Sequence, residues 1–106
     1  PGQLLMHKPV VLLLRHRHDA GASRELLEMA AALAVFALPV TVLALAPPER
    51  LLDINDADVA QLLADLPGYG TVSLESLGDS SQGGFHPVSR AQAQAVLEGA
   101  ATVIGD

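Results

Sequence analysis

The residues best suited to chemistry form the polar run 15–19, Arg-His-Arg-His-Asp, which directly follows a short apolar run. Two imidazoles one residue apart, His16 and His18, can bind a metal when both rings point the same way, and Asp19 would add an oxygen ligand. A third firm ligand is missing nearby, because His86 is remote in the sequence. His16 and His18 are therefore weak metal candidates, and the alternative is a solvated loop at the end of a strand.

The same region predicts a site for a small anion or nucleotide. Arg15 and Arg24 flank the expected start of a helix, where backbone N–H groups attract negative charge. Gly21 stands alone, so the glycine-rich fingerprint of a phosphate loop is absent. The alternative interpretation is an ion pair between Arg24 and a neighbouring acidic side chain.

Nucleophilic chemistry has little support in this sequence. The 106 residues contain no cysteine, which excludes disulfides, persulfides and thiolate metal sites formed by these residues. Ser76, Asp79 and His86 could be combined into a hydrolytic triad, but the G-x-S-x-G turn that would expose such a serine is missing. We therefore expect no catalytic residues, no cofactor and no enzyme activity.

Composition and charge narrow the classes of partner. The net charge is −6, with 6 basic against 12 acidic residues, which disfavours direct binding to a nucleic acid backbone. The longest uncharged stretch, 29–48, is split by Pro39, so we expect no membrane span. A cytoplasmic location is expected. Residues 1–7 are expected to be an N-terminal extension, either disordered or foreign to the native chain.

Strand-like and helix-like segments alternate along the chain, which predicts one three-layer α/β domain over 1–106. Its sheet should be mostly parallel, with four or five strands, helices on both faces and a flavodoxin-like strand order. Ser23 or Asp19 should cap the first helix. Strands are predicted at 10–14, 40–45, 71–74, 85–88 and 101–104, helices at 23–38, 56–66 and 90–98, and a loop with the pair Gly83-Gly84 at 75–84.

The order of these segments resembles the DsrE/DsrF-like sulfur-relay family, and within it the TusC/DsrF type of subunit. The likeness spans about residues 8–104 and rests on the order and spacing of short motifs. Two turns, 15–18 and 46–50, depart from the subfamily's pattern. The matching residues are Arg15, Arg24-Glu25-Leu26-Leu27, Ala34-Val35-Phe36, Pro39-Val40, Leu63, Leu66, Pro67, Tyr69 and Glu75-Ser76-Leu77.

The resemblance implies a subunit of a sulfur-transfer complex such as TusBCD, which serves 2-thiolation of the tRNA wobble uridine, or DsrEFH, which acts in sulfur oxidation. In the family, a cysteine in the loop after the third strand of the DsrE/TusD-type subunit carries the sulfur. The equivalent region here, near 75–78, holds none. This implies a non-catalytic role beside TusB- and TusD-like partners.

Self-association is the alternative to such a hetero-oligomer. A stand-alone homo-oligomer of the same fold would bind its anion near Arg15 and Arg24. In either assembly, Phe36 and Tyr69 are the candidate interface residues, and a core position is the alternative for Tyr69.

Overall fold

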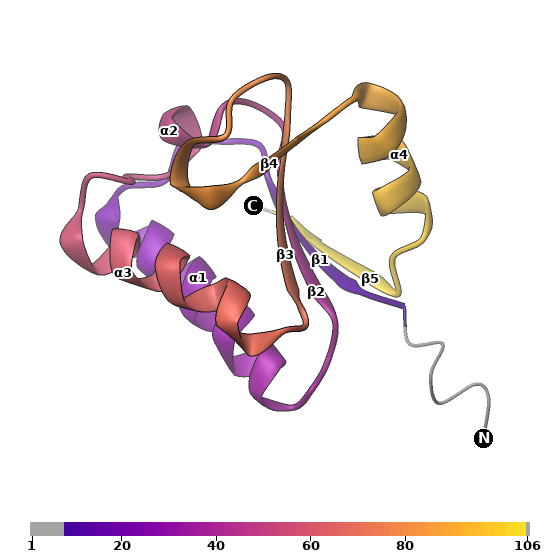
Figure 1. The fold of residues 1–106 in the computed structure, drawn as a ribbon, viewed down its shortest axis with the longest axis horizontal. Helices are drawn as coiled ribbons and strands as arrows, with labels where there is room; N and C mark the ends of the chain where they lie inside the picture. Colours follow the sequence, from indigo (N-terminus) through magenta and orange to yellow (C-terminus); the bar gives the residue numbers. More distant parts are fainter. Residues whose placement is uncertain (1–7, 106) are drawn as a thin grey trace.

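The computed structural model describes residues 8–105, so the extension predicted at 1–7 lies outside it. A five-stranded parallel sheet forms the middle layer, with helices on both faces (Figure 1). The strands are β1 (Val10–Leu14), β2 (Val40–Ala44), β3 (Val72–Leu77), β4 (His86–Val88) and β5 (Thr102–Gly105). The helices are α1 (Ala20–Val35), α2 (Pro48–Leu51), α3 (Ala57–Asp65) and α4 (Arg90–Glu98), with short 3-10 turns η2 (Leu66–Tyr69) and η3 (Gln82–Gly84).

The predicted fold class is confirmed: the domain has three layers and every strand pair is parallel. The strand order is β4-β3-β2-β1-β5, which differs from the 2-1-3-4-5 order of flavodoxin. Strands β1 to β4 are added consecutively in one direction, and the α4 connection then returns the chain to the free edge of β1. The direction in which successive strands are added therefore reverses at β1, which has β2 on one side and β5 on the other.

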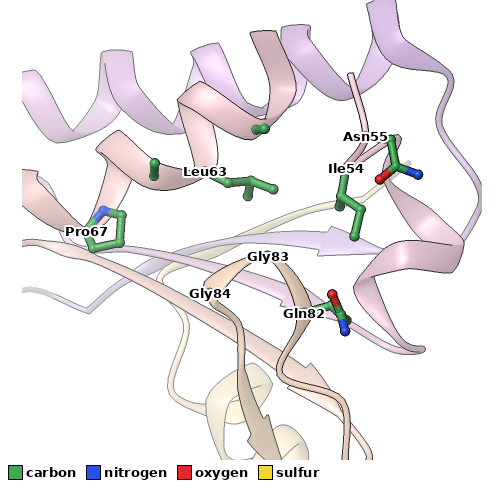
Figure 2. A pocket seen from close by; sticks show the side chains of 9 residues that line it. Ile54, Asn55, Leu63, Pro67, Gln82, Gly83 and Gly84 are labelled. Carbon is green, nitrogen blue, oxygen red and sulfur yellow. The ribbon is translucent and has the colours of Figure 1, made fainter. Parts of the chain in front are cut away.

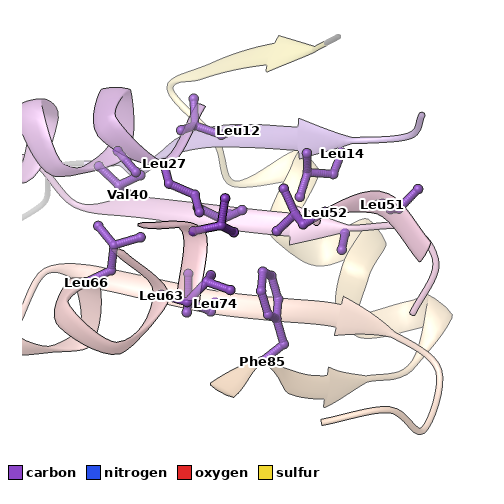
Figure 3. Close-up of a cluster of buried hydrophobic side chains, with 14 residues drawn as sticks. Leu12, Leu14, Leu27, Val40, Leu51, Leu52, Leu63, Leu66, Leu74 and Phe85 are labelled. Carbon is purple, nitrogen blue, oxygen red and sulfur yellow. The ribbon is translucent and has the colours of Figure 1, made fainter. Parts of the chain in front are cut away.

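The two faces of the sheet carry cores of different size. The larger core lies between the sheet and helices α1 and α3, and Phe85 is its largest buried side chain (Figure 3). On the α4 face, the fully buried set is Val11, Leu43 and Ala93, with partly buried neighbours around it. One nine-residue helix thus covers a face of five strands.

The structure shows which of the predicted capping residues begin the helices. Of the two predicted caps for α1, Asp19 is the one used: its side chain accepts from the Ala22 N–H at 2.8 Å. Ser23 is instead buried inside the first turns. The predicted capping of α4 by Ser89 is confirmed, with a reciprocal Gln92 side-chain bond to the Ser89 N–H.

The third strand is longer than its sequence predicted. The segment 75–77 was expected to begin a loop, but it continues β3. Glu75 and Ser76 lie in register with Leu43 and Ala44 of β2. Pairing with an already buried neighbour supplies the backbone hydrogen bonds that outweigh the low strand propensity of these residues. The short helix α2 was not predicted either; it begins at Pro48, where a missing N–H costs nothing.

Candidate functional site

The loop after β1 lies at the carboxyl ends of the strands, where open parallel sheets bind ligands. It is held in place from two sides. The His18 N–H donates to the Leu51 carbonyl of α2 at 2.8 Å, and the Ser23 hydroxyl donates to the His18 carbonyl at 3.2 Å. The loop is therefore anchored both to α2 and to the beginning of α1.

The two histidines proposed as metal ligands contact each other through the backbone. His18 Nδ1 lies 2.8 Å from the His16 carbonyl oxygen. A carbonyl only accepts, so His18 Nδ1 is the donor in this contact. No group of three or more potential ligand side chains gathers anywhere in residues 8–105. His16 and His18 thus lie in contact, but no third metal-ligating side chain gathers with them among these residues.

The two arginines proposed for anion binding have different settings. Arg15 is exposed and directly follows β1, and Arg24 lies in the second turn of α1. The Arg24 guanidinium is 3.3 Å from Asp58 of α3, in an exposed ion pair. The sequence offered an ion pair with a neighbouring acidic side chain as the alternative for Arg24, and the partner in the structure is 34 residues away.

A crevice lies where the strand order reverses, beside β1 and β5. It is a cavity of about 240 Å³. Its lining is mostly apolar, with His18 from the β1–α1 loop and Glu25 from α1 as its ionisable groups. Of the metal and anion candidates, only His18 lines it. Its remaining lining residues are Leu12, Ala22, Leu26, Met29, Ile104 and Gly105.

Two serine hydroxyl groups form hydrogen bonds near the end of β3. Ser76 is fully buried, and its Oγ donates to the Ser80 carbonyl at 2.9 Å. The Ser80 hydroxyl in turn donates to Glu49 Oε1 at 3.0 Å. His86, the histidine of the triad considered above, begins β4 and lies in register with Glu75. The Ser76 hydroxyl is thus already hydrogen-bonded to a backbone carbonyl.

The candidate interface residues lie at the opposite, amino edge of the sheet. Phe36 caps the C-terminus of α1 and is 77% exposed, next to Val35 at 69%. Tyr69 in η2 is 45% exposed, so its alternative assignment to the core is wrong. We call Val35, Phe36 and Tyr69 the amino-edge surface.

Sequence reasoning missed a cavity of about 540 Å³. It lies beside the pair Gly83-Gly84, which the sequence indicated as a flexible turn and the structure shows as part of the 3-10 turn η3. The glycine pair is the feature of the sequence that marks this cavity. It does not predict the cavity by itself, because Leu63, which packs opposite Gly83, lies far away in the sequence.

No protein-family model matches the chain, and no curated protein matches it either. Within residues 8–105, none of the helices combines the length and the apolar character that crossing a bilayer requires.

Proposed function

We propose that the chain is a non-catalytic subunit of a sulfur-relay complex that resembles TusBCD or DsrEFH. The observation that carries the proposal is the set of residues at the end of β3. There, the resemblance expects a sulfur-carrying cysteine in a catalytic subunit. This chain has Glu75, Ser76, Leu77 and Gly78 instead, with the Ser76 side chain fully buried.

The chemistry of the relay explains why a partner must supply the nucleophile. A thiolate attacks the terminal sulfur of a donor persulfide, a new S–S bond forms, and the donor leaves as a thiolate without net oxidation. A hydroxyl cannot replace the thiolate, because serine is a far weaker nucleophile and forms no stable link to sulfane sulfur. The Ser76 hydroxyl is also hydrogen-bonded to Ser80.

The amino-edge surface supports the idea of a partner. Phe36 presents most of its ring to solvent at the end of a helix, where it makes no contribution to the core. Aromatic side chains are enriched at protein interfaces because a rigid ring buries a large area at a small entropic cost. We assign Phe36 and Tyr69 to the contact with a homologous subunit.

The test is purification of the tagged chain from its own cells, followed by mass spectrometry of the intact assembly. We expect two further small α/β subunits, one of which carries a reactive cysteine. That cysteine should gain the mass of one sulfur atom when the assembly is incubated with a persulfide donor, and this chain should not.

A matched pair of variants tests the assigned surface. Phe36→Glu should release the partners, because a charge buried at an interface without a counter-charge is costly. Ala95→Glu adds the same charge at an exposed position of α4, on the other face of the sheet, and should leave the assembly intact. Recovery of the chain alone, or persulfide formed on this chain, would contradict the proposal. A homo-oligomer that binds phosphate and loses it in an Arg15→Ala variant would favour the stand-alone alternative.

A further inference from the structure

A cavity of about 540 Å³ lies between helix α3 and the turn η3, on the face of the sheet opposite α4. This volume is within the range of small-molecule sites. Figure 2 shows its lining, with Pro67 at one end and Asn55 and Gln82 at the other. The other lining residues are Ile54, Ala60, Leu63, Ala64, Gly83 and Gly84.

The lining carries no ionisable side chain, although the chain has 12 acidic and 6 basic residues. Its walls are aliphatic, formed by Ile54, Leu63 and Pro67. The polar side chains in the lining are the carboxamides of Asn55 and Gln82. Both residues are exposed, and within residues 8–105 neither side-chain amide hydrogen-bonds to another residue, so each can exchange water for a ligand.

The turn that forms one wall of the cavity is built on two left-handed residues, Gly83 at φ +68° and Gly84 at φ +81°. A Cβ atom at Gly83 would lie 3.2 Å from Cδ1 of Leu63, closer than ordinary packing allows. Glycine therefore lets the backbone of the turn approach α3, and peptide groups without side chains line this part of the cavity. Phe85, which follows the turn, is 2% exposed and fixes the turn to the core. The cavity is thus formed before any ligand arrives.

We propose that this cavity binds an uncharged ligand with a flat apolar body and one amide or lactam edge. A charged ligand would meet no counter-charge among the lining side chains and would lose part of its hydration against Ile54 and Leu63. An anion would in addition be repelled by the net charge of −6. A carboxamide offers both a donor and an acceptor, which matches the paired donor and acceptor of an amide edge. The proposal does not depend on the sulfur-relay function.

Three probes of similar shape test it: 2-quinolinone, which is a neutral lactam; quinoline, which lacks the lactam; and quinoline-2-carboxylate, which is an anion. Each is titrated into the full ¹⁵N-labelled chain and followed by NMR. We expect saturable shifts for 2-quinolinone at the side-chain amides of Asn55 and Gln82 and at the backbone of Gly83 and Gly84. Both other probes should bind at least about tenfold more weakly, as the loss of one or two hydrogen bonds predicts.

Two kinds of variant assign the shifts to the cavity. Ala64→Phe fills it from the exposed side of α3 and should abolish the binding of 2-quinolinone, whereas Ala95→Phe makes the same change at an exposed position of α4 and should preserve it. Gln82→Leu should weaken the binding of 2-quinolinone about tenfold and the binding of quinoline, whose ring nitrogen can accept only one hydrogen bond, by less. Equal binding of lactam and carboxylate, unchanged binding to Ala64→Phe, or shifts located on α4 or β5 would overturn the proposal.

Discussion

At the scale of single residues, Ala37 is the clearest conflict between a side chain and its backbone. It ends α1 in the left-handed conformation, at φ +61°, as the one non-glycine residue of 8–105 with positive φ. The Leu38 N–H bonds to the Leu33 carbonyl at 3.3 Å, the bonding pattern in which glycine is preferred. Ala37→Gly should raise the free energy of unfolding by about 0.5–1 kcal/mol, because the relieved strain exceeds the extra chain entropy of glycine. Urea unfolding followed by circular dichroism measures it.

The control for this change is Ala32→Gly, in the exposed interior of the same helix. There the same substitution should lower the free energy of unfolding by about 1 kcal/mol, since glycine is a poor helix former. Two changes of the same sign would show that the conformation at Ala37 is not strained.

At the scale of elements, Ser23 joins three segments that are separate in the sequence. Its buried hydroxyl donates to the His18 carbonyl and accepts from the Asp53 N–H, both at 3.2 Å. Ser23→Ala should therefore lower the free energy of unfolding by about 1–3 kcal/mol, because two part-buried backbone groups lose this partner. Hydrogen exchange at the Asp53 amide should become faster. Ser81→Ala, at an exposed serine, should change stability by less than about 0.5 kcal/mol.

At the scale of the whole molecule, stability is concentrated on the face covered by α1 and α3. Phe85 is buried there among residues of β1, β2, β3 and α3, as Figure 3 shows. Phe85→Ala should lower the free energy of unfolding by about 3–5 kcal/mol, which is a large share of the total for a domain of this size. Chemical denaturation measures the change.

Phe36→Ala removes the same side chain from the amino-edge surface and should change the stability of the isolated chain by less than about 0.5 kcal/mol. A comparable loss at both positions would mean that Phe36 is packed in solution and would argue against its role as an interface residue.

The sequence by itself determined most of the helices and strands and the limits on the chemistry. Apolar runs placed β1 and β2, Ser89 and Gly99 bounded α4, and the absence of cysteine excluded thiol chemistry by these residues. These features follow from local spacing and residue type.

Tertiary structure alone decided the order of the strands, the extension of β3 through Ser76, the pairing of Arg24 with Asp58, and the cavity beside Gly83. Each depends on residues far apart in the chain that meet only when the layers pack. A backbone hydrogen bond from a neighbouring strand, or the close approach of a helix to a glycine, leaves no periodic signal in the sequence around it.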